Sequence, residues 1–140
     1  MSRRTGRPLH FVDSEAVLLT SVSSLAVLTQ AAKEMGSSIP HLSMRNFRPN
    51  IVVAGAQPFA ESSWETLRIG HGTVLQGVKD CERCQVVNVD PSAGVVQRGG
   101  LTLLKSIPPT TIGKKTRFGR LFSPVECGRI QIGDRVVIEH

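Results

Sequence analysis

The hydrophobic spacing of the chain changes near residue 50, and this change constrains the fold more than any other sequence feature. Before it, apolar residues from Val22 to Met35 recur at the spacing of one helix face, which predicts an amphipathic helix over residues 22–35. Ser21 or Ser23 can cap the start of this helix, and Gly36 suits its end. After it, short β-like runs are separated by turn residues. We therefore predict a mixed α/β, β-dominated fold with one main helix near the N-terminus.

The predicted strands are short apolar or β-like runs: Ala16–Leu19, Ile51–Val53, Thr66–Ile69, Thr73–Val78, Gln85–Val89, Leu121–Pro124 and Arg135–Ile138. Two segments, Leu67–Leu75 and Ile130–Ile138, each have the pattern strand, tight glycine turn, strand. Repeated hairpins of this kind predict a barrel-like sheet, closed or nearly closed, because closure removes exposed sheet edges. Leu101–Ile107 predicts one or two helical turns, which Pro108 ends before a loop over Thr110–Thr116.

The length of 140 residues suits one domain with its own hydrophobic core. We expect a disordered N-terminus over residues 1–10 and a folded domain over residues 11–140. The segment Met1–Arg4 is basic, but no apolar signal-peptide core follows it, and no apolar run is long enough to span a membrane. These features predict a cytoplasmic protein without a membrane partner.

The charge balance points to an anionic partner. The formal net charge is +6, which favours either nucleic acid or phosphorylated small molecules. The chain has no tyrosine, one tryptophan and five phenylalanines, and its basic residues are not interleaved with aromatic ones. Because single-stranded nucleic acid is bound by stacking on aromatic side chains, we expect a small-molecule partner and no nucleic acid.

Cys81 and Cys84 enclose Glu82 and Arg83, and this stretch carries the most reactive groups of the sequence. Its spacing is compatible with a thioredoxin-like redox pair, part of a zinc site, two buried inert thiols, or a single thiolate that binds a soft metal. For the last interpretation, Arg83 would favour the ionised form of Cys84. Spacing alone favours buried thiols, and the motif by itself does not choose. We expect no stable disulfide between Cys81 and Cys84, because the chain has an odd number of cysteines and no secretion signal.

A set of ordered motifs extends from about Phe11 to the C-terminus. They are Asn-Phe-Arg-Pro-Asn-Ile-Val-Val over residues 46–53 with Gly55, then Phe59–Trp64, Leu67–Gly70, Cys81–Cys84, Val89–Pro91, Phe118–Gly119 and Gly128–Asp134. Together they resemble the MOSC domain. That domain forms the C-terminal part of molybdenum-cofactor sulfurases and of the mitochondrial amidoxime-reducing component and its bacterial relatives.

The resemblance implies that the chain binds the molybdenum cofactor, a pterin that carries a phosphate and a dithiolene. Cys84 matches the residue that ligates molybdenum in the amidoxime-reducing members, which makes it the expected metal ligand and catalytic residue. Arg48 and Asn50 match residues that hold the pterin, and Arg83 stands beside the metal ligand, so these three are the expected cofactor-binding residues. An arginine can make paired charge-assisted hydrogen bonds to a phosphate. Pro49 would stiffen the presentation of its two neighbours.

The resemblance leaves three functions open. The first is a molybdenum-dependent reductase that removes oxygen from N-hydroxylated or related oxygenated small molecules and draws on an external electron donor. The second is a non-catalytic module that carries cofactor or sulfur, and the third is a structural remnant without metal. The chain has no pyridoxal-phosphate domain like that of the sulfurases, so we expect no desulfurase activity. It also lacks the N-terminal β-rich domain of the amidoxime-reducing relatives, so a truncated fragment is a further alternative.

Two further details of the resemblance concern polar contacts. Ser14 and Glu15 fall where relatives present polar groups to the cofactor. Val87 and Asn88 stand where the family commonly has threonines shortly after the metal cysteine. This difference predicts a change in polarity on the substrate side of the site.

Overall fold

The computed structural model describes residues 17–36 and 41–139. The segment predicted to be disordered, residues 1–10, lies outside the described residues, as do Ser14 and Glu15. In the described part, the chain forms a mixed α/β fold in which the sheet dominates, and the predicted fold class is confirmed.

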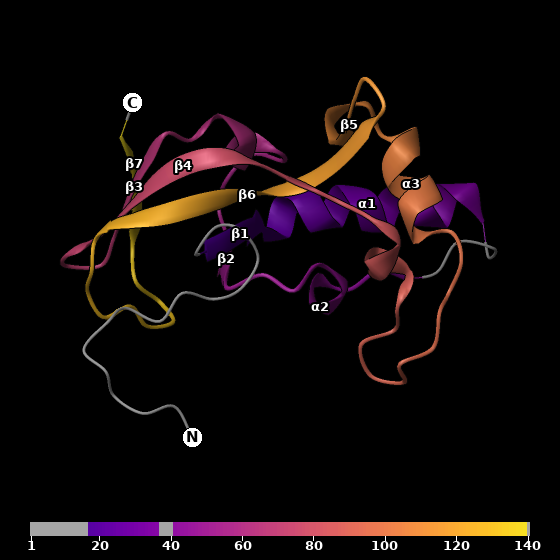
Figure 1. Cartoon of the computed structure of the whole chain (residues 1–140), viewed down its shortest axis with the longest axis horizontal. Coiled ribbons are helices and arrows are strands. Elements are labelled where there is room, and N and C mark those ends of the chain that lie inside the picture. Colours follow the sequence, from indigo (N-terminus) through magenta and orange to yellow (C-terminus); the bar gives the residue numbers. More distant parts are fainter. Residues whose placement is uncertain (1–16, 37–40, 140) are drawn as a thin grey trace.

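The described strands form one curled, half-barrel sheet (Figure 1). They are β1 (Val17–Ser21), β2 (Ile51–Val53), β3 (Thr66–Ile69), β4 (Thr73–Glu82), β5 (Thr111–Ile112), β6 (Lys115–Glu126) and β7 (Val136–Glu139). The order is β2-β1-β6-β4-β3-β7, and β5 pairs with β6. β1 and β2 are parallel, whereas the other paired strands are antiparallel. β4 and β6 are the longest strands, and together they form the spine of the molecule.

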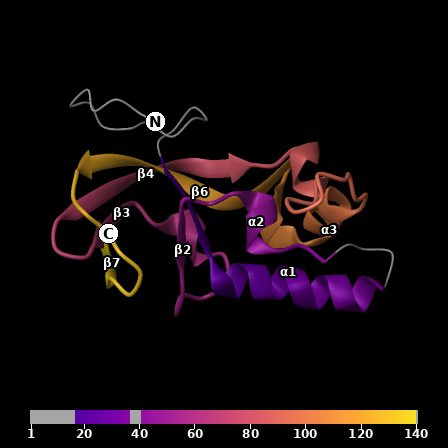
Figure 2. The same ribbon diagram turned by 90° about the horizontal axis from the view of Figure 1, so that it is seen from below.

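Helices and helical turns lie along this spine. They are α1 (Val22–Met35), α2 (Met44–Phe47) and α3 (Gly100–Ser106), with the 3₁₀ turns η1 (Ala60–Ser63), η2 (Gln85–Asn88) and η3 (Pro108–Thr110). Figure 2 shows α1 running alongside β4 and β6, while α2 and α3 lie toward the end of the molecule away from β3 and β7. The helical elements therefore gather at one end of the half-barrel.

α1 confirms the predicted main helix with the predicted bounds. Ser21 is its N-cap and accepts a hydrogen bond from the backbone N–H of Ser24 at 3.1 Å, which satisfies one otherwise unpaired amide of the first turn. Gly36 is its C-cap and takes φ 95°, a conformation that residues with a Cβ rarely adopt. The buried stripe is narrower than predicted, because Val22 and Met35 are 51% and 42% exposed.

Several local predictions were wrong. The segment predicted as the strand Gln85–Val89 forms the helical turn η2, because Val87 packs into the core and the side chain of Asn88 binds the backbone N–H of Leu101 at 3.1 Å. The region Thr110–Thr116 contains β5 and the start of β6 instead of a loop. The predicted barrel-like sheet, in contrast, is confirmed as a half-barrel, in which β2 and β7 are the edges among the described strands.

The hairpin predictions had opposite outcomes. Leu67–Leu75 contains the antiparallel pair β3–β4, as predicted. In Ile130–Ile138 only β7 is a strand, and it pairs with β3 instead of with the residues that precede it. The turn before β7 is closed locally, because the backbone N–H of Gln131 donates to Asp134 Oδ2 at 2.9 Å.

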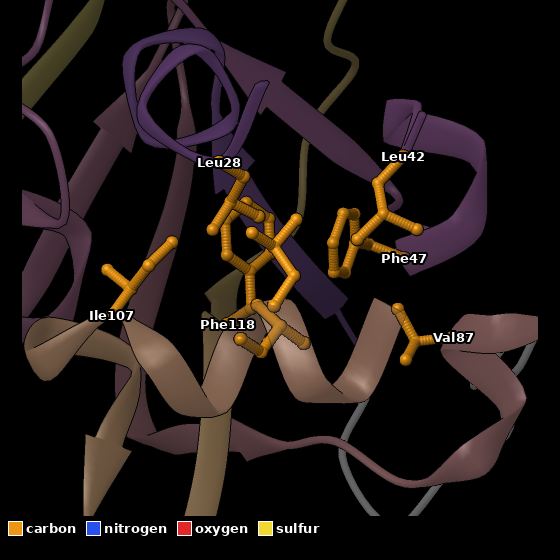
Figure 3. Packing of buried hydrophobic residues seen from close by; sticks show 8 residues of the cluster. Leu28, Leu42, Phe47, Val87, Ile107 and Phe118 are labelled. Atoms are coloured by element: carbon orange, nitrogen blue, oxygen red, sulfur yellow. The ribbon is translucent and has the colours of Figure 1, made fainter. Parts of the chain in front are cut away.

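Buried side chains form two clusters at opposite ends of the spine. The helix-end core contains Leu28, Leu42, Phe47, Val87, Leu103, Leu104, Ile107 and Phe118 (Figure 3). The strand-end core contains Leu19, Val53, Trp64, Leu67, Ile69, Leu75 and Phe122. The first joins helices to one strand, whereas the second is formed mainly by residues of the strands.

Candidate functional site

The site begins with an irregularity in the pairing of β4 and β6. Asp80 pairs with Arg120 and Glu82 with Arg117, so the single residue Cys81 lies opposite the two residues 118 and 119. Such a bulge leaves backbone groups of the longer strand without a partner on the neighbouring strand. Gly119 permits it: its φ is 79°, and an added Cβ would lie 2.7 Å from the carbonyl oxygen of Leu19.

Arg83 fills the space that the bulge creates. Its Nε and Nη2 atoms donate to the carbonyl oxygen of Phe118 at 2.9 and 2.7 Å, and its Nη1 donates to the carbonyl oxygen of Phe47 at 3.1 Å. The guanidinium also lies 5.4 Å from the ring centroid of Phe47, at cation–π distance. Burial lowers the pKa of this guanidinium, and the thiols of Cys81 and Cys84, when ionised, act in the opposite direction. Arg83 therefore clamps β6 to the end of α2.

A second clamp joins α2 to η2 through Asn46. Its Nδ2 donates to the carbonyl oxygens of Val87 and Val89 at 3.2 and 3.1 Å. Its Oδ1 accepts from the backbone N–H and the hydroxyl of Ser43 at 2.9 and 3.0 Å, which holds the first turn of α2. Every hydrogen-bonding group of this amide is used for positioning. α2 and η2 are consequently fixed against each other, although about 40 residues separate them.

Arg48 occupies the C-cap of α2 in a left-handed conformation, with φ 53° and ψ 47°. This conformation is costly for a residue with a side chain and is often found where the surroundings hold a functional residue in place. The clamp by Arg83 on the preceding carbonyl provides that constraint. Because Cys84 follows Arg83 and Arg48 follows Phe47, the clamp links the two chain segments that carry these predicted site residues.

Arg48 opens onto a groove with a volume of about 740 Å³. The polar residues that line it are Arg45, Asn46 and Arg48. Its apolar lining consists of Met44, Pro49, Val52, Val86, Val89 and Pro91. α2, β2 and η2 therefore each contribute one side of the groove.

Cys84 is exposed and forms the N-cap of η2, two residues before the groove residue Val86. Cys81 is half-buried within β4, and all three cysteines are thiols without a disulfide. Among residues 17–36 and 41–139, no group of three histidine, cysteine or acidic side chains could hold a metal ion. Of the two cysteines in the motif, Cys84 is thus the more exposed, although neither is part of the groove lining.

Asn50 lies between the groove residues Pro49 and Val52 but is not itself part of the lining. Its side-chain Oδ1 accepts from the backbone N–H of Leu18 at 2.7 Å, and its own backbone N–H donates to the Leu18 carbonyl at 2.9 Å. These bonds extend the pairing of β1 and β2 by one residue. The contacts of Asn50 in the structure therefore position the strand that follows Arg48.

Val87 and Asn88 do not face the groove. Both are buried, Val87 in the helix-end core and Asn88 against α3. Their difference from the family's threonines accordingly affects packing in this chain. Sequence reasoning also missed Arg45 as a groove residue, because the short helix α2 that places it there was not predicted.

The described site thus combines the exposed thiol of Cys84 with a nearby groove whose polar lining includes two arginines. The MOSC domain model matches residues 6–137, and the chain belongs to the MOSC family. It is 36% identical over 135 residues to mitochondrial amidoxime-reducing component 1 of Homo sapiens, covering 91% of this chain and 38% of that protein. It is 35% identical over 103 residues to a molybdenum cofactor sulfurase of Solanum lycopersicum, covering 70% of this chain and 12% of that protein.

A third relative is mitochondrial amidoxime reducing component 2 of Bos taurus, 32% identical over 133 residues, with 90% of this chain and 38% of that protein covered. The chain therefore spans less than two thirds of the length of each of these relatives. In the described part of the chain, no helix has the length and apolarity needed to cross a membrane.

Proposed function

We propose that this chain binds the molybdenum cofactor in the groove, with Cys84 as the metal ligand, and that it reduces N-hydroxylated small molecules. The observation that carries the proposal is the exposed thiol of Cys84, two residues before Val86, which lines the groove together with two arginines. Its relatives include amidoxime-reducing components and molybdenum cofactor sulfurases.

The residues present fit the chemistry of that cofactor. The apolar lining of the groove suits a flat pterin ring, and a guanidinium suits a phosphate through paired, charge-assisted hydrogen bonds. A thiolate is a preferred ligand for soft metals, and Cys84 is accessible. Asn50 remains a proposed contact through the part of its amide that Leu18 does not use.

Arg83 has a different role in this proposal from that of Arg48. Three of its N–H groups are already donated to backbone carbonyls, so its main task is to hold Cys84 and Arg48 beside each other. Its positive charge next to the thiol adds to the attraction for an ionised sulfur ligand. Arg48, which is exposed, provides the direct contact with the cofactor.

When bound, the molybdenum cofactor would supply two-electron redox chemistry. The reduction of an amidoxime to an amidine consumes two electrons and two protons and releases one water. An external electron donor is therefore part of the proposal, together with the small-molecule substrate. A cytoplasmic location stays a prediction, since the relatives named above include mitochondrial proteins.

The test compares Cys84→Ser with Cys81→Ser and Cys127→Ser, all produced in cells that make the cofactor. Serine keeps the size of the side chain but replaces an ionisable soft sulfur with a hydroxyl. Elemental analysis should find that Cys84→Ser loses most bound molybdenum, while the two control variants keep most of it. Parent protein without molybdenum, or equal losses in Cys81→Ser and Cys84→Ser, would refute Cys84 as the ligand.

Turnover separates the reductase from a carrier. Parent protein that holds molybdenum should convert an amidoxime probe to the amidine when reduced methyl viologen supplies the electrons, and Cys84→Ser should not. A protein that retains the cofactor through Cys84 but shows no turnover would instead support the carrier function.

A further inference from the structure

Arg45 is a second basic residue of the groove, and the resemblance assigns it no role. It lies on α2 three residues before Arg48, and both side chains line the same cavity. Arg48 is held there by its left-handed backbone, and Arg45 by the helix that Asn46 attaches to η2. Two guanidiniums therefore face one space from a short segment that is fixed at both ends.

Neither arginine forms an ion pair with an acidic residue in the described part of the chain. In the described part of the chain, the groove lining contains no aspartate or glutamate. The side chain of Arg48 makes no hydrogen bond or ion pair with another described residue. Arg45 makes one long hydrogen bond, from Nη1 to the hydroxyl of Ser92 at 3.3 Å.

Asp90 is an acidic residue between the groove residues Val89 and Pro91. Its carboxylate already accepts hydrogen bonds within the turn that it starts. Its Oδ1 accepts from the backbone N–H groups of Ser92 and Ala93 at 2.7 and 3.1 Å, and its Oδ2 accepts from Gln97 Nε2 at 3.0 Å. These backbone bonds lower the pKa of Asp90, with a smaller contribution from the charge of Arg45. The carboxylate is thus directed into the turn 90–97, and the donors of Arg45 stay available to a ligand.

Two guanidiniums that line one groove with no acidic residue in its described lining match a doubly charged anion better than a singly charged one. A phosphate monoester carries close to two negative charges at neutral pH and offers three acceptor oxygens. The fork geometry of arginine matches such oxygens in pairs. The apolar remainder of the lining, including Pro49, Val52 and Val86, suits a flat ring on the other side of the ligand.

We infer that Arg45 and Arg48 together form a phosphate-monoester site at the basic side of the groove, with Arg45 as a ligand-binding residue. This inference rests on the proposed function for the identity of the ligand, a pterin monophosphate. The pair of arginines selects the phosphorylated form of the ligand, and the apolar lining contributes affinity for the ring.

The experiment measures the binding of neopterin monophosphate and of unphosphorylated neopterin to the full chain by titration calorimetry. The parent protein should prefer the monophosphate by about tenfold or more, the effect of losing one charge-assisted contact. Arg45→Gln and Arg48→Gln should each reduce that preference by about tenfold, while Arg45→Lys, which keeps the charge without the fork, should restore part of it. Arg98→Gln is the control, since Arg98 is exposed but lies outside the groove lining.

The outcomes separate this inference from the proposed function. Equal affinity of the parent for the two pterins, no measurable binding of either, or an equal loss in Arg98→Gln would overturn the phosphate site. If one of these three results is obtained but molybdenum is bound through Cys84, the phosphate site is refuted and the proposed function is still supported. An Arg45-dependent preference in a parent that never holds molybdenum would support the phosphate site and refute the proposed function.

Discussion

The helix-end and strand-end cores are stabilised by different kinds of contact. In the strand-end core, buried side chains come from strands and from the turn η1, and the backbone ladders β3–β4 and β3–β7 hold those strands in register. In the helix-end core, five elements distant in sequence meet, and side chains such as Arg83 and Asn46 bind their backbones together. The groove lies at the helix end. The geometry of the candidate site therefore depends on hydrogen bonds from individual side chains, whereas the geometry of the sheet depends mainly on backbone hydrogen bonds.

The largest expected effect comes from deleting one buried phenylalanine in each core. Phe47 and Phe122 are both fully buried, so Phe47→Ala and Phe122→Ala should each lower the free energy of unfolding by about 3–5 kcal/mol in urea titrations. The two variants should differ in their affinity for neopterin monophosphate. Phe47 contacts Phe118 at 4.1 Å between ring centroids and precedes Arg48, so its loss should also weaken binding of neopterin monophosphate to the folded protein.

Phe122→Ala should leave that affinity within about twofold of the parent, well under 1 kcal/mol. Phe47→Leu and Phe122→Leu form a milder pair that keeps most of the buried volume and makes the same comparison if the alanine variants do not fold. Equal loss of binding in the two positions would show that the two cores are not independent and would break the comparison.

An intermediate effect is expected from removing one arginine at each end. Arg83→Met takes the partner from the carbonyls of Phe118 and Phe47, and buried acceptors without partners cost about 1–3 kcal/mol each, so unfolding should become easier by about 2–4 kcal/mol. Arg68 forms an exposed ion pair with Glu139, at 43% and 45% side-chain exposure, so Arg68→Met should change stability by less than about 1 kcal/mol. Chemical denaturation of both variants measures the difference, and similar small losses would contradict the clamp assigned to Arg83.

The smallest effect concerns pH and the turn at the rim of the groove. The pKa of Asp90 is lowered in the folded protein, chiefly by the backbone N–H groups of Ser92 and Ala93. Stability from this group is therefore present above the unfolded pKa and is lost as the pH falls through the folded one. Asp90→Asn keeps an acceptor oxygen for both N–H groups, and it removes the charge and the oxygen that accepts from Gln97 Nε2.

Melting temperatures should consequently be higher in the parent than in Asp90→Asn near neutral pH. The difference should shrink as the pH falls below about 4, where the carboxyl of the parent also loses its charge. A difference that persists unchanged in acid would show that the charge of Asp90 does not stabilise the turn.

Local sequence signals were sufficient where an element depends on its own residues. The caps Ser21 and Gly36 bound α1 as predicted, because a capping hydroxyl and a positive φ are properties of single residues. The turn between β3 and β4 formed as predicted, since a short hairpin is closed by neighbours in the chain. The similar pattern of Ile130–Ile138 did not form the predicted hairpin, because β7 pairs with β3, which lies more than 60 residues away in the sequence.

For the site, resemblance singled out Cys84 and Arg48, and the structure places them on the two sides of one clamp. Arg45 could not be found in this way, because the four-residue helix α2 has no periodic stripe and depends on Asn46 for its position.

The sequence by itself determined the fold class, the main helix and the residues with reactive groups, because these follow from composition and short-range spacing. Only the tertiary structure decided which reactive groups share a surface. The bulge at Phe118–Gly119 exposes a carbonyl that Arg83 binds, and the same guanidinium binds the carbonyl of Phe47 at the end of α2. Bonds between segments so far apart leave no pattern in the sequence, since their geometry exists only after the strands have paired.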